Sequence, residues 1–129
     1  MSTKLRVAVA DDHAGMLGWL AATLRQEFEV VASVGNGQAV LEVVARLDPD
    51  VIVVDLAMSP LNGLEVTRSL RQSGARTGVV IVSAYDEPEL VKVGLEAGAQ
   101  GFVLKSRVIE ELVPAVRKAA LKRQSASGE

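Results

Sequence analysis

The sequence contains no cysteine, one histidine, one tryptophan, one tyrosine and two phenylalanines among its 129 residues. The absence of cysteine excludes a disulfide framework and metal sites built from thiolates, and it is typical of a protein in a reducing compartment. Neither sign of charge dominates, because 14 basic residues face 16 acidic ones and leave a net charge of −2. We therefore expect no direct binding to nucleic acid and no attraction to membranes.

Long hydrophobic runs are also missing. Residues 1–6 contain two basic side chains, Lys4 and Arg6, and the apolar stretch behind them ends at Asp11. This stretch is too short for a signal peptide or a membrane span. With 49% hydrophobic and 23% charged residues, the composition is that of one well-packed globular domain. We expect a cytoplasmic domain over residues 1–123, followed by a flexible tail at 124–129.

Short apolar runs alternate along the chain with stretches of helical periodicity. The runs are continuous and rich in valine, as in parallel strands that are covered on both faces. They are Leu5–Ala10, Glu29–Val34, Val51–Val54, Val79–Val82 and Gly101–Leu104. Apolar residues with helical spacing follow each run, less regularly over Leu64–Arg71 and Pro88–Ala97. Five βα units predict an α/β domain with an open doubly wound sheet, since they are too few for an eight-stranded barrel.

Polar side chains stand directly after four of the five runs. Asp11 and Asp12 follow the first run, Asp55 the third, Ser83 the fourth and Lys105 the fifth. The carboxyl ends of parallel strands share one edge of a sheet, where ligands bind in open α/β folds. We therefore expect these side chains to converge at that edge.

These residue types together favour metal-assisted phosphoryl transfer. Three carboxylates at one place repel one another, a divalent cation relieves this repulsion, and carboxylates together with water are the ligands that Mg²⁺ selects. A carboxylate beside a metal can act as a nucleophile toward phosphorus and form an aspartyl phosphate; Asp55, at the end of the most apolar run, is the candidate. Lys105 supplies positive charge and Ser83 a hydrogen bond. Singly, each has an ordinary role, but the combination points to chemistry. We also expect one of Asp11 and Asp12 to cap the helix that follows.

In these motifs the chain resembles the receiver domain of bacterial two-component response regulators, from about Lys4 to Lys122. The matching segments are Val9–His13, Val54–Met58 with Asn62-Gly63, Val82–Ala84 and Gly98–Lys105. The resemblance implies a flavodoxin-like three-layer sandwich with five parallel strands in the order 2-1-3-4-5. It also implies a phosphorelay switch rather than an enzyme, with chemistry limited to its own phosphorylation and dephosphorylation.

The resemblance assigns the acidic residues. Asp55 corresponds to the phosphoacceptor of the family. Asp11 and Asp12 correspond to the residues that hold Mg²⁺ together with Asp55 and the backbone carbonyl of Ala57. Ala57 also occupies one of two variable positions that influence how long the phosphoryl group persists.

The remaining site residues are assigned in the same way. Ser83 matches the switch hydroxyl and Lys105 the lysine that pairs with the phosphoryl group. Ala84 matches the small neighbour that leaves room for this group, and Tyr85 the second position that influences its lifetime. Phe102 stands where the family has an aromatic residue that rotates on activation; it carries no hydroxyl here, so we expect it to work through packing alone.

Two residues depart from a simple reading of the motifs. Ser59 stands where the family usually has proline, and the proline follows at Pro60, so we expect a differently shaped loop after Asp55. His13 invites a role as a metal ligand or in phosphorelay, but its place at the first turn of a helix favours a structural or surface role.

The resemblance implies a sensor histidine kinase or a phosphotransfer protein as partner. We expect homodimerisation or an effector contact through the face formed by the fourth helix, the fifth strand and the last helix. The motifs at both ends resemble those of receivers joined to helix-turn-helix transcription factors, which makes transcription regulation a candidate output. No such module follows within these residues. The chain is either a stand-alone receiver or a receiver separated from its effector, and we favour the first.

Two other functions share parts of this pattern. A phosphatase or phosphotransferase with an aspartyl nucleophile needs a second carboxylate two residues after Asp55, where Ala57 stands. A flavodoxin-like nucleotide or flavin carrier needs a loop rich in glycine, serine and threonine after the first strand, where Asp11 and Asp12 would repel phosphate unless a metal is bound.

Overall fold

The computed structural model describes residues 4–127, with side chains up to Lys122. The strands are β1 (Arg6–Ala10), β2 (Glu29–Val34), β3 (Val51–Asp55), β4 (Gly78–Ser83) and β5 (Gly101–Leu104). The helices are α1 (Ala14–Arg25), α2 (Gly37–Leu47), α3 (Gly63–Gln72), α4 (Pro88–Glu96) and α5 (Val108–Ser127), with a 3-10 turn η1 (Lys105–Arg107) before α5. All strand pairs are parallel and the order is β2-β1-β3-β4-β5. The predicted fold class is confirmed.

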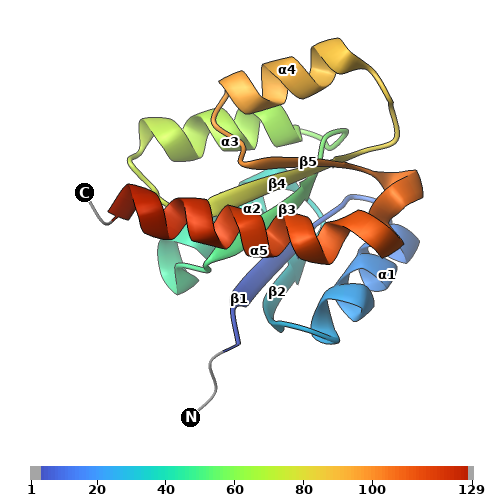
Figure 1. The fold of residues 1–129 in the computed structure, drawn as a ribbon, viewed down its shortest axis with the longest axis horizontal. Helices are drawn as coiled ribbons and strands as arrows, with labels where there is room; N and C mark the ends of the chain where they lie inside the picture. Colours follow the sequence, from blue (N-terminus) through green and yellow to red (C-terminus); the bar gives the residue numbers. More distant parts are fainter. Residues whose placement is uncertain (1–3, 128–129) are drawn as a thin grey trace.

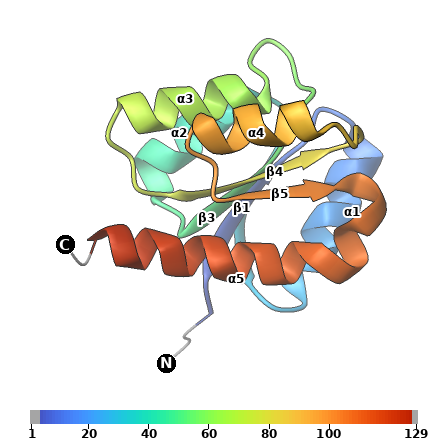
Figure 2. The same ribbon diagram turned by 45° about the horizontal axis from the view of Figure 1, so that its top comes forward.

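Helices cover both faces of the sheet and create two separate cores. Figures 1 and 2 show α1 and α5 on one face and α2, α3 and α4 on the other. Neighbouring residues of a strand point to opposite faces, so Val51 and Val53 pack into the α1–α5 core while Ile52 and Val54 pack into the other. Every residue of β3 and β4 is buried, which explains why these strands read as continuous apolar runs.

The register of the strands brings their carboxyl ends level at one edge. Ala10 pairs with Val54, and Asp55, the last residue of β3, pairs with Val82. The next residue along the chain is held as well, because Leu56 N donates to Val82 O at 2.8 Å. The first residues of the loops that follow these strands are therefore neighbours in space.

The first helix is capped by His13 rather than by Asp11 or Asp12. The Nδ1 of His13 accepts a hydrogen bond from Met16 N at 3.3 Å. Asp11 does not cap the helix; its Oδ1 accepts from His13 N at 2.8 Å and so orients the capping residue. The structural role favoured for His13 is thus observed, and both aspartates retain oxygen atoms for other partners.

The opposite edge of the sheet is held by Arg71, which the sequence analysis did not single out. Its guanidinium donates four hydrogen bonds, all to neutral oxygens: Gly98 O at 3.0 Å, Ala75 O at 2.9 Å, Thr77 O at 3.0 Å and Gln100 Oε1 at 3.0 Å. Burial lowers the pKa of this guanidinium. One side chain therefore ties the end of α3 to the loops that precede β4 and β5.

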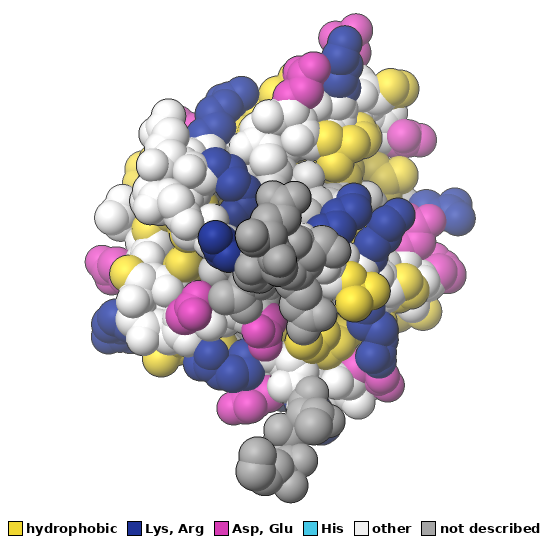
Figure 3. Space-filling view, turned by 60° about the vertical axis from the view of Figure 1, so that its left-hand side comes forward, with side chains coloured by type: hydrophobic (Ala, Val, Ile, Leu, Met, Phe, Trp, Pro, Cys, Tyr) yellow, Lys and Arg dark blue, Asp and Glu magenta, His cyan; other side chains and the backbone are white. Residues whose placement is uncertain are grey.

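The face of the molecule seen in Figure 3 carries both signs of charge. In Figure 3, basic and acidic side chains are interspersed and the hydrophobic patches between them are small. Within the described residues, no helix combines the length and the apolar character needed to cross a membrane. The backbone of α5 continues to Ser127, so the helix includes most of the tail expected at 124–129, while residues 128–129 lie outside the described residues. The flexibility of this tail stays a prediction.

The Arg71 contacts lead to a stability prediction. We expect Arg71→Ala to lower the free energy of unfolding by about 1–3 kcal/mol, because it leaves partly buried carbonyl groups without a donor. Arg68→Ala, on the exposed side of the same helix, should change it by less than about 0.5 kcal/mol. Urea denaturation of both variants measures the difference, and equal values would contradict the role given to Arg71.

Candidate functional site

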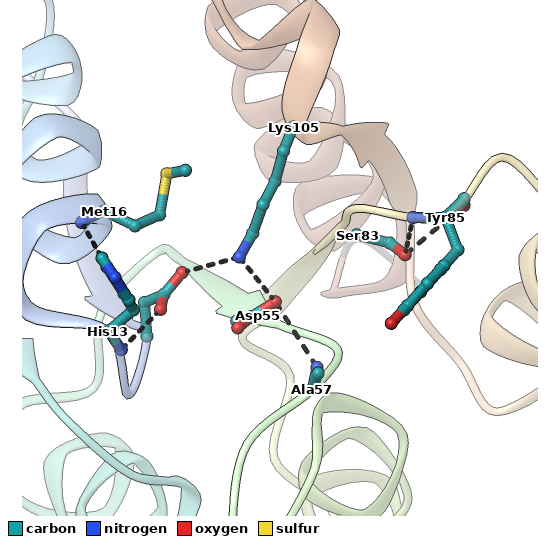
Figure 4. A network of polar contacts seen from close by, with 8 residues as sticks. His13, Met16, Asp55, Ala57, Ser83, Tyr85 and Lys105 are labelled. Carbon is teal, nitrogen blue, oxygen red and sulfur yellow. Dashed lines mark hydrogen bonds and ion pairs between the residues drawn. The ribbon is translucent and has the colours of Figure 1, made fainter.

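Asp55 lies buried at the carboxyl end of β3, with 3% of its surface exposed. Its Oδ1 is 3.3 Å from Lys105 Nζ and accepts a hydrogen bond from Ala57 N at 3.4 Å. The close-up in Figure 4 shows Lys105 reaching down from the start of η1 to this carboxylate. The most apolar strand thus delivers a single carboxylate to the edge of the sheet, where a cation meets it.

Asp11 is equally buried, with 1% exposed, and shares the same cation. Its Oδ2 is 3.3 Å from Lys105 Nζ, so the ammonium bridges two carboxylates. Apart from this ion pair, Asp11 Oδ2 has no partner among the described residues, because it accepts no hydrogen bond from them. One buried acidic oxygen therefore remains able to take a further ligand.

Two carboxylates against one ammonium leave the site short of positive charge. Burial raises the pKa of Asp55 above its ordinary value of 3.8, and the nearby charge of Asp11 raises it further. The charge and hydrogen bond of Lys105, and the backbone N–H of Ala57, lower it, but the net shift is upward. A divalent cation would relieve this imbalance.

Asp12 completes the acidic cluster. One carboxylate oxygen from each of Asp11, Asp12 and Asp55 lies within 4.8 Å of the others, and Asp12 is exposed. Carboxylate oxygens are the ligands of hard cations such as Mg²⁺, which keeps several of its waters. The residues therefore fit a magnesium site that opens to solvent. The carbonyl of Ala57 makes no described contact with the cluster, so its part in the site stays a prediction.

The hydroxyl of Ser83 is engaged away from the carboxylates. Ser83 ends β4 and is 1% exposed. Its Oγ accepts a hydrogen bond from Tyr85 N at 3.0 Å and donates to Tyr85 O at 3.4 Å (Figure 4). To meet a phosphoryl group, the hydroxyl hydrogen has to leave Tyr85 O. Tyr85 itself is 56% exposed and Ala84 is exposed, so the approach on this side is open.

Phe102 lies apart from the acidic cluster, on the face of β5 that is turned toward α4. It is partly buried and packs against the core beneath α2, α3 and α4. A Cβ added at Gly94 of α4 would lie 3.2 Å from the Phe102 ring, so the absence of a side chain at Gly94 lets α4 rest on this ring. The structure links Phe102 to α4 directly and to Asp55 only through the sheet.

The loop after Asp55 is shaped by the start of α3. Asn62 and Glu65 form a reciprocal capping box, with both hydrogen bonds at 2.9 Å. Gly63 N donates to Leu56 O at 3.0 Å, which closes the loop. Within it the Ser59–Pro60 peptide bond is cis. The Asn-x-x-Glu spacing is a sequence signal for such a cap, so this feature was predictable from the sequence.

Comparison with known proteins agrees with this geometry. A family profile described as the response regulator receiver domain matches residues 7–117. The chain is 36% identical to the transcriptional regulatory protein DegU of Brevibacillus brevis over 121 aligned residues. These residues cover 91% of this chain and 50% of DegU. It is 37% identical over 117 residues to the transcriptional regulatory protein NarL of Mycobacterium tuberculosis, which covers 88% and 53%.

Solved structures extend the similarity to the fold. The signal receiver domain of NarL from Mycobacterium tuberculosis matches with a TM-score of 0.81 at 30% identity, over 90% of this chain and 98% of that chain. The present chain spans about half the length of the curated relatives it matches. Since the family profile covers most of the sequence and the sheet order is the one expected for it, the chain belongs to the receiver domain family of two-component response regulators.

Proposed function

We propose that this domain takes up a phosphoryl group on Asp55 from the phosphohistidine of a sensor kinase or a phosphotransfer protein, or from an acyl phosphate, and acts as a switch in the cytoplasm. The observation that carries the proposal is the buried Asp11–Lys105–Asp55 arrangement beside the exposed Asp12. It combines a nucleophile, a fixed cation and a set of oxygen ligands at one edge of the sheet.

The chain's own groups account for the transfer step. A carboxylate oxygen of Asp55 attacks the phosphorus, the bond from phosphorus to the donor's nitrogen or oxygen breaks, and the donor leaves with its electron pair. Mg²⁺ held by Asp11, Asp12 and Asp55 would supply positive charge to the transferred oxygens. Lys105 already contacts Asp55 Oδ1 at 3.3 Å, so its ammonium can pair with the phosphoryl group as charge develops there.

The new charge can bias α4 through Ser83. The hydrogen bond from Ser83 Oγ to Tyr85 O is long, at 3.4 Å, so exchanging it for a bond to a phosphoryl oxygen costs little. The following helix is weakly held: the N-cap Glu87 makes no side-chain hydrogen bond, and Gly94 is the one buried residue of α4. We propose that α4 and Phe102 shift together as two populated states exchange weight.

A partner surface lies between α4 and α5. A groove of about 390 Å³ runs over β5 between these helices. It is lined by apolar residues, Val91, Leu95, Phe102 and Ala115 among them, with Glu111, Lys118 and Lys122 on its α5 side. We propose that this face carries homodimerisation or an effector contact, and that its occupancy depends on the state of α4.

Transcription regulation is the proposed output. DegU and NarL are named transcriptional regulators, and each is about twice as long as the matched region. DNA contact would then lie outside this domain. Neither a phosphatase nor a flavin carrier gains support, since Ala57 offers no second carboxylate and Asp11 and Asp12 occupy the phosphate-loop position.

Loss of the nucleophile is the direct test. We expect Asp55→Asn to abolish phosphate incorporation from acetyl phosphate with Mg²⁺, because an amide oxygen is a much poorer nucleophile than a carboxylate. Asp86→Asn, an exposed carboxylate in the loop after β4, should incorporate phosphate like the wild type. Intact-mass spectrometry after incubation measures both, and full labelling of Asp55→Asn would refute the assignment.

A substitution of Lys105 should change phosphoryl transfer without weakening metal binding. In Lys105→Met we expect phosphate uptake to slow by about 100-fold, because a cation that stabilises the developing charge is lost. Mg²⁺ binding should be as tight or tighter, since the two buried carboxylates lose a competing cation. Lys118→Met, an exposed change on α5, serves as control. Weaker Mg²⁺ binding in Lys105→Met, measured by calorimetry, would contradict this division.

The raised pKa of Asp55 predicts a pH-dependent stability. The folded state binds this proton more tightly than the unfolded state, so the contribution is complete below about pH 3.8 and is lost as pH rises through the raised pKa. Without Mg²⁺, Asp55→Asn should therefore unfold at a higher temperature than the wild type at neutral pH, and the gain should vanish in acid. Saturating Mg²⁺ should stabilise the wild type more than the variant. A constant gain at every pH would contradict the electrostatic explanation.

A further inference from the structure

The start of α2 lies directly against the loop that follows Asp55. Gly37 is the first residue of α2 and is buried. A Cβ built on it would lie 2.6 Å from Leu61 O, and 2.8 Å from both Leu61 Cβ and Val66 Cγ2. Any side chain at this position would overlap the backbone of the loop, so the close approach requires glycine.

The same arrangement recurs on the other side of the loop. Gly63, the first residue of α3, would place a Cβ 2.9 Å from Asp55 O and 3.1 Å from Leu56 Cα. Each glycine follows an asparagine N-cap, since Asn36 Oδ1 accepts from Ala39 N at 2.8 Å and Asn62 Oδ1 from Glu65 N at 2.9 Å. The loop is thus enclosed between two helix starts built in the same way.

Backbone hydrogen bonds hold both ends of the loop. Leu56 N is held by Val82 O at 2.8 Å, and Leu56 O accepts from Gly63 N at 3.0 Å. Leu61 packs into the core beside α2, and the nearby Met58 is buried. A push on Leu61 is therefore passed along the few residues that separate it from Ala57 and Asp55.

We propose that Gly37, remote in sequence from every predicted site residue, is a positioning residue for the phosphoacceptor loop. By having no side chain it lets Leu61 sit against α2, and this seating sets the place of Ala57 and the Asp55 carboxylate relative to Asp11. The proposal rests on the proposed function, because it assigns Gly37 a part in the same Mg²⁺ and phosphate site.

The test compares Mg²⁺ affinity with stability in three glycine variants. Gly37→Ala should weaken Mg²⁺ binding by about 10-fold, the usual effect of disturbing the groups that orient a metal site, and should slow phosphate uptake from acetyl phosphate. Gly35→Ala, where a Cβ would meet nothing within 4 Å, should match the wild type in both.

The third variant separates positioning from simple destabilisation. A Cβ at Gly78 would lie 3.0 Å from Ala119 O of α5, at the start of β4 and so at the edge of the sheet away from the site. Gly78→Ala should therefore lower the unfolding temperature yet bind Mg²⁺ with wild-type affinity. NMR titration of the amide signals with Mg²⁺, and thermal unfolding without it, give both quantities.

The outcomes are distinguishable. Wild-type Mg²⁺ affinity in a folded Gly37→Ala protein, or equal losses in the Gly37 and Gly78 variants, overturns the role of Gly37. If Gly37→Ala does not fold, Leu61→Ala decides, since it loosens the loop from the core beside α2: weaker Mg²⁺ binding supports the proposal and unchanged binding overturns it. A wild-type protein that binds no Mg²⁺ and takes up no phosphate refutes the proposed function itself.

Discussion

The structure depends on an unequal charge balance at the edge of the sheet, where the single ammonium of Lys105 faces two buried carboxylates. Asp11 and Asp55 each lie 3.3 Å from it. A buried charge is tolerated only when it is paired, and a half-compensated pair is costly. This cost falls where the pKa of Asp55 is raised and Asp11 Oδ2 accepts no hydrogen bond from the described residues, so the site is suited to binding a cation. The charge imbalance that destabilises this edge of the sheet is therefore also what allows it to bind a cation.

The surrounding fold holds this site in place by backbone geometry more than by side chains. Parallel register sets the ends of β1 and β3 level, and two helices begin with asparagine-glycine pairs that let their first turns touch the loop between them. Polar side chains alone would be flexible. Close backbone packing cannot be relieved by a rotamer change, which is why we propose that it positions the carboxylates.

Rigidity is distributed unevenly around the sheet. Arg71 fixes the loop that leads from α4 into β5 through Gly98 and Gln100. The beginning of α4, in contrast, has no side-chain cap, and the helix buries only Gly94. α4 is therefore followed by a firmly bonded loop and begins without a side-chain cap, and such lightly held elements are the ones that move in the switching proposed above.

Much of this molecule could be predicted from its sequence. Continuous valine runs required strands buried on both faces, and polar residues directly after them required a cluster at the carboxyl edge, because period and chain direction are local properties. The acidic cluster and the position of Lys105 followed from that rule together with the family resemblance. The cap on α1 was predicted wrongly, since His13 Nδ1 accepts from the first turn of the helix while Asp11 Oδ1 accepts from His13 N instead.

What only the tertiary structure decided are the contacts between segments far apart in the chain. These are the sharing of Lys105 by two carboxylates, the hydrogen bonds of Arg71 to Gly98 and Gln100, and the approach of Gly37 to Leu61. The type and spacing of the residues determine which side-chain groups can take part in the site. Distances of about 3 Å between them are set only when the packing of whole helices against the sheet has been fixed.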